Sequence, residues 1–256
     1  MMTVTWVSYL IVCPALFMTG LINAIGCGGA LISLPAYMLA GMPAHSAVAT
    51  NKLSSSCGST VTTIRFLKAK MIDLKFACPA IIAAIISASL GAKVSILIPE
   101  KLLAGAMMIV LPVIAVIVFL PSFNGPEEEK QLEHSVKNYA TAIAAAVIVG
   151  FYDGIYGPGT GTLLIIAFRS IAKMSLKQAN GQARIINWPT DVSALVVFLL
   201  HGQVNFAIGI PAMICNMVGS YVGAQLVIKE GGKIIKPCVI LMLGALLLKQ
   251  ITDYCG

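Results

Sequence analysis

The sequence has few charged side chains. Only 11% of its 256 residues are Asp, Glu, Lys or Arg, whereas about 25% is usual in a soluble domain. Hydrophobic residues make up 58% of the chain, and its mean hydropathy is +0.92. A core of this size cannot bury so much apolar surface, so lipid must cover much of it. The scarcity of charge therefore excludes an ordinary soluble domain and indicates an integral membrane protein.

Residues typical of metal sites and catalytic centres are scarce too. The three histidines are too few and too dispersed for a metal site, and the seven cysteines form no CxxC pair. We interpret the cysteines as small packing residues of a membrane bundle. The sequence contains neither an HExxH string nor a Walker A motif. We therefore expect no metal, no cofactor, no enzymatic activity and no ATP hydrolysis.

The net charge of +7 does not indicate a nucleic-acid partner, because the basic residues are scattered and lie mostly at the ends of apolar runs. Three groups of them flank turns: Arg65, Lys68, Lys70 and Lys75; Arg169, Lys173 and Lys177; Lys229, Lys233 and Lys236. Basic residues beside membrane segments favour the cytoplasmic side. We therefore expect these turns in the cytoplasm, a lipid bilayer around the chain, and no nucleic acid.

Ten apolar runs divide the chain, and most approach the roughly 20 residues that a helix needs to cross the hydrocarbon core. They span 3–25, 28–41, 45–67, 76–98, 101–120, 137–153, 158–171, 177–200, 206–228 and 234–251. The runs 28–41 and 158–171 are shorter and follow the glycine-rich breaks 26–29 and 157–161. They predict the returning arms of two helical hairpins. The pattern predicts an all-α polytopic membrane protein with about 8 to 10 membrane segments.

The two halves of the sequence resemble each other. A shift of 132 positions superimposes residues of the same kind. The pairs include Lys52 and Arg184, Pro79 and Pro211, and Gly91 and Gly223. Prolines, glycines and basic residues rarely coincide in one register by chance. We interpret the pattern as an internal duplication, which is a recurrent feature of transporter folds.

The charge pattern predicts that the two halves are inverted relative to each other. With the basic turns in the cytoplasm, the N-terminus and the C-terminus both lie outside and the hydrophilic stretch 122–135 lies inside. Each half then crosses the membrane an odd number of times. We therefore expect a first transmembrane repeat over 1–121, a cytoplasmic linker over 122–135 and a second repeat over 136–256.

Four charged residues lie inside membrane segments: Lys52, Asp153, Arg184 and Asp191. Charge at this depth is expensive and indicates a functional site. Alternatively, Lys52 and Arg184 snorkel to an interface or form structural ion pairs. Asp153 either pairs with Arg184 or takes up a proton. Asp153 and Asp191 are therefore candidates for coupling transport to protons.

Polar residues follow both membrane cations at helical spacing. Ser55, Ser56, Ser59 and Thr63 share a helix face with Lys52, and Asn187 and Asp191 share one with Arg184. A lipid-facing helix would not keep such stripes, so they face protein, water or substrate. The alternative is that the stripes only hold helices together.

The glycine breaks provide the other part of a candidate site. A helix that begins after Gly29 or after Gly159 presents free backbone N–H groups and the positive end of its dipole. Inside a membrane such an end suits an anion, although the glycines also serve close helix packing as an alternative. The candidate substrate-binding residues for a small anion are Lys52, Asn51, Thr50, Gly28, Gly29, Arg184, Asn187, Gly159 and Thr160.

The same strings carry a family resemblance. The first half contains Gly26-Cys27-Gly28-Gly29 and Ala47-Val48-Ala49-Thr50-Asn51-Lys52-Leu53, and the second half contains Gly150-Phe151-Tyr152-Asp153-Gly154 with Gly157-Pro158-Gly159-Thr160-Gly161. With these strings the chain resembles the TauE/SafE, or sulfite exporter, permeases over nearly its whole length, most closely their YfcA-like branch. The resemblance implies a permease of the cytoplasmic membrane that moves a sulfur-containing anion, such as sulfite or an organosulfonate.

We therefore expect a secondary transporter of a small anion that works by alternating access and draws its energy from an ion or substrate gradient. Its expected partners are the anion, a co- or counter-transported proton, the bilayer, and a second copy of the chain in a homodimer. The alternatives are an anion channel, which would carry current far faster than a carrier, and a membrane protein without a transport function.

Overall fold

A computed structural model describes residues 6–26, 29–103, 105 and 134–230. Within these ranges all regular secondary structure is helical, which confirms the predicted all-α class. The helices are α1 (Trp6–Gly26), α2 (Ala30–Leu39), α3 (Ala44–Lys68), α4 (Leu74–Leu97), α6 (Val136–Ile155), α7 (Thr160–Ser170), α8 (Leu176–Leu200) and α9 (Phe206–Glu230). Gly28, the apolar run 234–251, most of the run 101–120 and nearly all of the linker 122–135 lie outside the described residues.

Within the described residues, five helices are long and apolar enough to cross a membrane: α1, α4, α6, α8 and α9. Their outward faces carry large apolar side chains, such as Leu10, Ile86 and Ile148, each more than half exposed. A soluble protein rarely exposes apolar surface so continuously, and lipid covers it in a membrane. The chain is therefore a multi-pass membrane protein, as the composition predicted.

Helix α3 differs from these five helices because it is polar and central. It has 25 residues and is rich in Ser and Thr, and more than half of its residues are buried. It packs against both α8 and α9. Protein rather than lipid therefore surrounds the polar stripe that follows Lys52, as the sequence predicted.

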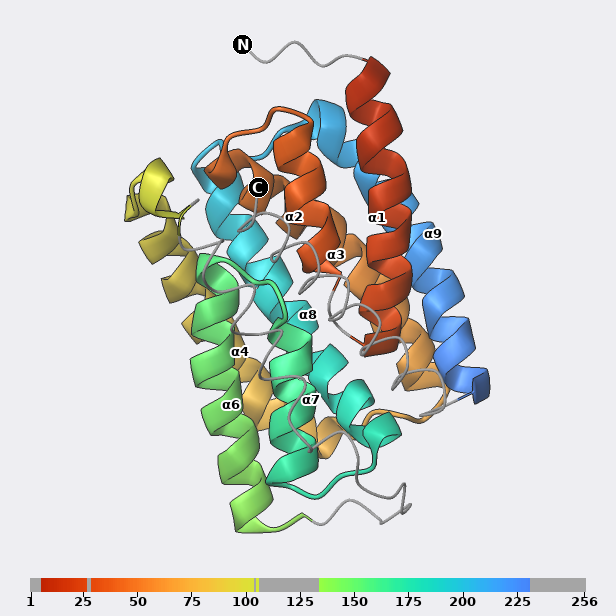
Figure 1. The fold of residues 1–256 in the computed structure, drawn as a ribbon. Helices are drawn as coiled ribbons and strands as arrows, with labels where there is room; N and C mark the ends of the chain where they lie inside the picture. Colours follow the sequence, from red (N-terminus) through yellow and green to blue (C-terminus); the bar gives the residue numbers. More distant parts are fainter. Residues whose placement is uncertain (1–5, 27–28, 104, 106–133, 231–256) are drawn as a thin grey trace, which may run out of the picture.

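The boundaries of two helices match the shift of 132 positions that predicts an internal duplication. Helices α3 and α8 both have 25 residues, and their ends lie 132 positions apart, at 44 and 176 and at 68 and 200. Helix α1, the first helix of the first half, packs against α9 of the second half. Helix α6, the first helix of the second half, packs against α4 of the first half. In Figure 1, α1 runs from top to bottom and α6 from bottom to top. The inverted orientation of the halves in the membrane stays a prediction.

The two short helices follow the glycine breaks. Helix α2 has 10 residues and α7 has 11, which is about 15–17 Å of helix and about half of the hydrocarbon core. They extend in opposite directions from the middle of the bundle (Figure 1). Gly157 and Gly159 have φ angles of 97° and 78°, a left-handed conformation that glycine adopts without a steric penalty. This conformation lets the chain reverse directly before α7.

The apolar core has two parts, one towards each end of the bundle. Phe66, Phe76 and Phe168 belong to the part where α3 and α7 end and α4 begins. Tyr37 and Phe198 belong to the other part, where α2 and α8 end. The four membrane charges lie on the segments between these two parts. A polar layer is thus enclosed by apolar packing on both sides.

Glycines bring neighbouring helices into close contact. A Cβ atom on Gly154 of α6 would lie 2.1 Å from the carbonyl oxygen of Ala88 on α4, and one on Gly91 would lie equally near the carbonyl oxygen of Phe151. Neither position has room for a side chain. The contact between α4 and α6 fixes the height at which α6 presents Asp153, which lies one residue before Gly154.

Candidate functional site

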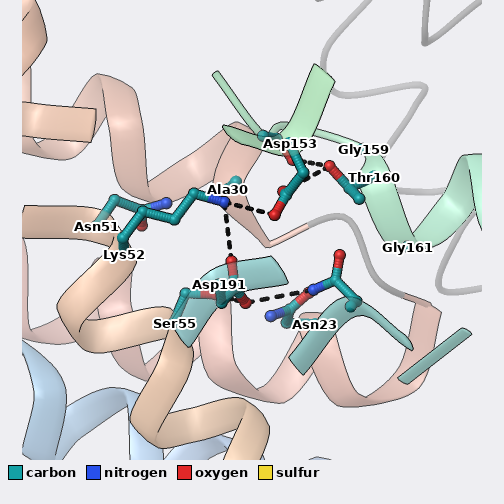
Figure 2. A pocket seen from close by; sticks show the side chains of 12 residues that line it. Asn23, Ala30, Asn51, Lys52, Ser55, Asp153, Gly159, Thr160, Gly161 and Asp191 are labelled. Atoms are coloured by element: carbon teal, nitrogen blue, oxygen red, sulfur yellow. Dashed lines mark hydrogen bonds and ion pairs between the residues drawn. The ribbon is translucent and has the colours of Figure 1, made fainter. Parts of the chain in front are cut away.

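A small cavity lies in the polar layer between the two halves (Figure 2). About 20 Å³ of it is open to the centre of a water molecule, which is room for one or two waters. Its lining comes from α1, α2, α3, α6, α7, α8 and the α6–α7 turn. The lining residues are Asn23, Ala30, Asn51, Lys52, Ser55, Asp153, Gly157, Gly159, Thr160, Gly161, Asn187 and Asp191.

Lys52 is the centre of this site. Its side chain is 2% exposed, and Nζ lies 2.7 Å from Asp153 Oδ2 on α6 and 2.9 Å from Asp191 Oδ1 on α8. Figure 2 shows the ammonium group held between the two carboxylates. A buried ammonium ion needs such partners, because an unpaired charge in this environment would be very unfavourable. The sequence allows a pair between Asp153 and Arg184, whereas the structure pairs Asp153 with Lys52. This difference arises from how the helices of the two halves pack, which sequence spacing does not reveal.

Asp191 is held by donors from two helices. Its Oδ1 pairs with Lys52, and its Oδ2 accepts hydrogen bonds from Ser55 at 2.7 Å and from Ser59 at 3.3 Å, both on α3. Asn187, one turn earlier on α8, donates its side-chain amide to the same oxygen at 3.3 Å. The polar stripe of α3 therefore binds a carboxylate of the other half.

Asp153 has a different environment. Its Oδ1 lies 2.7 Å from the hydroxyl of Thr160, which in turn lies 2.6 Å from the carbonyl oxygen of Gly157. Its Oδ2 faces Lys52, and no hydroxyl or amide of the described residues donates to that oxygen. The hydroxyl of Thr190 also lies beside Asp153, but it donates to the carbonyl oxygen of Asn187, 2.7 Å away. Asp153 thus depends mainly on Lys52 for its charge balance.

Arg184 is completely buried on α8. One guanidinium nitrogen donates to the hydroxyl of Ser59 at 3.3 Å, and another donates to the carbonyl oxygen of Asn23 on α1. The hydroxyl of Ser59 in turn donates to Asp191 Oδ2. Arg184 does not line the cavity formed by the described residues, and it is connected to the lining residue Asp191 through Ser59.

The beginnings of both short helices reach the cavity. Ala30 is the first residue of α2, and Thr160 and Gly161 begin α7 after the cap residue Gly159. The first N–H groups of a helix have no partner within the helix and carry its positive dipole end. The cavity therefore brings together a Lys ammonium group, two carboxylates and the beginnings of two helices.

Two amide side chains complete the wall of the cavity. Asn51 accepts a hydrogen bond of 2.6 Å from Ser33 on α2 through its Oδ1, which orients its side-chain amide. Asn187 uses its amide nitrogen for Asp191, and its Oδ1 is buried without a donor among the described residues. A water molecule or a hydroxyl group of a bound ligand would satisfy this oxygen.

Two further predicted site residues are not among the described residues that line the cavity. Thr50 accepts a hydrogen bond of 3.0 Å from the backbone N–H of Asn205, just before α9 begins, and is not part of the cavity lining among the described residues. Gly29 packs against α1, because a Cβ atom there would lie 2.4 Å from the carbonyl oxygen of Thr19. Lys52, Asn51, Asn187, Gly159, Thr160, Asp153 and Asp191 line the cavity together, and Gly28 lies outside the described residues.

Five lining residues were not among the predicted site residues. They are Asn23, Ala30, Ser55, Gly157 and Gly161. Ser55 follows Lys52 by three residues, and both glycines belong to the second glycine break, so sequence spacing could have included these three. Asn23 and Ala30 come from α1 and α2, and only the packing of these helices brings them to the cavity.

The family model of the sulfite exporters TauE/SafE matches residues 12–249, which is most of the chain and includes every residue of the site. The chain belongs to the TauE/SafE family. It is a membrane transporter of that family, and the resemblance seen in the glycine breaks and the Lys52 helix is confirmed.

Curated relatives of the TauE/SafE chain support this assignment. It is 30% identical over 240 residues to "Probable membrane transporter protein ORF9" from Sinorhizobium sp, covering 93% of this chain and 90% of the relative. It is 29% identical to "Probable membrane transporter protein YfcA" from Escherichia coli strain K12, covering 93% and 88%. A Haemophilus influenzae "Probable membrane transporter protein" is 27% identical, covering 93% and 92%. No solved structure shows significant similarity to this chain.

Proposed function

We propose that this TauE/SafE protein is a secondary transporter for a small sulfur-containing anion, sulfite or an organosulfonate, and that it works by alternating access. The observation that carries the proposal is Lys52. It is a buried cation in a water-sized cavity, it lies beside the beginnings of two short helices, and its partners come from the other half of the chain. The family's description as sulfite exporters supports the substrate class.

The size of the cavity supports a carrier that must change shape. A sulfite ion has four heavy atoms, and a site with room for one or two waters cannot enclose it without movement of the walls. The contacts across the cavity are ion pairs and hydrogen bonds between α3 of one half and α6 and α8 of the other. Movement of one half against the other would break these contacts and open the site to one side.

The distribution of basic residues supports an orientation in the cytoplasmic membrane. Arg65 and Lys68 lie in the last turn of α3, and Arg169 lies in the last turn of α7. These helix ends face the lower end of the bundle in Figure 1. We propose that this end is cytoplasmic, which places the beginning of α1 outside. By the repeat, both termini of the chain are then extracytoplasmic.

Flux measurements test the transport proposal. The purified protein is placed in liposomes, and exchange of labelled sulfite and of labelled methanesulfonate is followed. We expect saturable exchange of at least one anion, and we expect Lys52→Ala and Arg184→Ala to reduce it strongly. Lys93→Ala on the exposed face of α4 is the matched control. The proposed site is wrong if both substitutions leave exchange at the level of the control.

An anion channel is the second candidate function. A channel would need a continuous aqueous path, whereas the polar layer has apolar packing on both sides. This arrangement favours the carrier. Recording from a planar bilayer separates the two, because a carrier turns over far too slowly to give single-channel currents.

A further inference from the structure

We propose that Asp153 carries a proton together with the anion, so that transport is an electroneutral symport of one proton with one monovalent anion, while Asp191 stays ionised as the fixed partner of Lys52. This inference rests on the proposed anion transport and adds its coupling partner. It assigns different tasks to the two carboxylates that both contact Lys52.

The charges of the polar layer are balanced before an anion enters. Lys52 and Arg184 contribute two positive charges, and Asp153 and Asp191 contribute two negative charges. A monovalent anion in this layer would leave one negative charge without a counter-charge. Uncompensated charge in the centre of a membrane protein is strongly unfavourable. Uptake of one proton by a carboxylate restores neutrality.

The donors around each carboxylate decide which one takes the proton. If Lys52 turns towards an anion, Asp191 still keeps the hydroxyls of Ser55 and Ser59 and the amide of Asn187. Asp153 loses the ammonium group at Oδ2 and keeps the Thr160 hydroxyl at Oδ1, with the Thr190 hydroxyl beside it. A carboxylate that loses its counter-charge favours the neutral form. The proton therefore goes to Asp153.

Thr160 fits both protonation states of Asp153. Its hydroxyl lies between two acceptors, Asp153 Oδ1 at 2.7 Å and the carbonyl oxygen of Gly157 at 2.6 Å, but it has only one hydrogen. When Asp153 is ionised, one of the two short contacts has no hydrogen. When Asp153 is protonated at Oδ1, it donates to Thr160 and Thr160 donates to Gly157. Both contacts are then hydrogen bonds, so the Thr160 hydroxyl is in place to accept the hydrogen bond of a protonated Asp153.

The other polar groups around Asp153 have partners of their own and do not take up the proton in its place. Lys52 comes from α3, Asp191 and the hydroxyl of Thr190 come from α8, and Tyr152 precedes Asp153 on α6. Thr190 donates to its own helix, and the hydroxyl of Tyr152 donates to the carbonyl oxygen of Pro158 at 2.7 Å. Arg184 contacts this network through Ser59 and Asp191. Helix α4 presents Ala88 and Ala92 to the neighbouring Gly154.

The coupled step balances in atoms and charge. A proton from water forms an O–H bond at Asp153 Oδ1, the ion pair between Lys52 and Asp153 breaks, and Lys52 pairs with the anion while keeping Asp191. The loaded and the empty site are then both neutral. On the other side the anion leaves, the proton returns to water, and Lys52 pairs with Asp153 again.

The test compares pH-driven accumulation with exchange in the same liposomes. Labelled methanesulfonate is the first probe because it stays ionised and brings no proton of its own, and labelled sulfite is the second. For coupling of one proton to one anion, a gradient of one pH unit, acid outside, supports about tenfold accumulation. We expect this in the wild type, and we expect Asp153→Asn to bring the ratio of accumulation to exchange down about tenfold. Asp73→Asn at the cap of α4 is the control and should keep the wild-type ratio.

The outcomes separate the two proposals. If the wild type exchanges neither anion, the proposed function fails. If the wild type exchanges an anion but does not accumulate it, or if Asp153→Asn accumulates it as the wild type does, the proton inference alone fails. A folded Asp153→Asn protein without any exchange also overturns the inference, because Asp153 would then serve anion binding itself.

Two further variants keep the inference testable if Asp153→Asn does not fold. Thr160→Val removes the hydroxyl that accepts a hydrogen bond from protonated Asp153, and it should lower the ratio of accumulation to exchange several-fold. Thr160→Ser restores the hydroxyl and should restore the ratio. Equal ratios for the valine and serine variants would contradict the role of Thr160.

Discussion

Lys52 and Arg184 make equivalent contacts in opposite halves of the chain. Lys52 reaches Asp153 on α6 and Asp191 on α8, and Arg184 reaches the carbonyl oxygen of Asn23 on α1 and the hydroxyl of Ser59 on α3. Ser59 and Asp191 lie 132 positions apart, as Lys52 and Arg184 do. The contacts thus match the shift of 132 positions, and both carboxylates that pair with Lys52 come from the second half.

Removal of Lys52 should destabilise the protein. Lys52→Ala leaves Asp153 and Asp191 buried next to each other without their shared cation, and breaking a buried ion pair from one side typically costs about 3–5 kcal/mol. We expect a clearly lower thermal unfolding temperature in detergent. Lys93→Ala, at an exposed position, should unfold like the wild type. An unchanged unfolding temperature for Lys52→Ala would mean that the ion pairs do not contribute to stability.

The hydroxyl of Ser59 should matter more than that of Ser56, although both residues are buried on α3. Ser59 connects Arg184 to Asp191, so Ser59→Ala should cost about 1–3 kcal/mol. Ser56 donates to the carbonyl oxygen of Leu53 in its own helix, and Ser56→Ala should change stability little. Denaturation of both variants in detergent measures the difference. Equal effects would argue against the connection across the halves.

The close approach of α4 and α6 should tolerate no side chain at Gly154. Gly154→Ala places a methyl group 2.1 Å from the carbonyl oxygen of Ala88, and such overpacking typically costs about 1–3 kcal/mol. Lys93→Ala, at an exposed position of α4, should unfold like the wild type. Thermal unfolding of both variants checks this. A stable Gly154→Ala protein would show that the two helices have more room than the structure gives them.

The inverted orientation of the halves can be tested by labelling. Lys70 in the α3–α4 turn and His201 at the end of α8 are both exposed, and the predicted topology places them on opposite sides of the membrane. In a cysteine-free background, Lys70→Cys should react with an impermeant maleimide only after the cells are opened. His201→Cys should react in intact cells. Labelling of both from the same side would exclude the predicted inversion.

Much of the helical framework could be predicted from the sequence, because it depends on local properties. The apolar run 45–67 became α3 over Ala44–Lys68, and the run 177–200 became α8 over Leu176–Leu200. The lengths of apolar runs and the glycine breaks fix where helices form. The spacing of Ser55 and Ser59 after Lys52 fixes which side chains share a face.

The sequence by itself thus determined a helical membrane protein with four charges at membrane depth, and it pointed to the residues around Lys52. Only the tertiary structure decided that Asp153 pairs with Lys52, that Thr50 accepts a hydrogen bond from Asn205, and that Asn23 reaches the second cation. The physical reason is that periodicity along one helix defines its polar face but not the helix against which this face packs. That choice depends on close contacts such as Gly154 against Ala88, which join segments far apart in the chain.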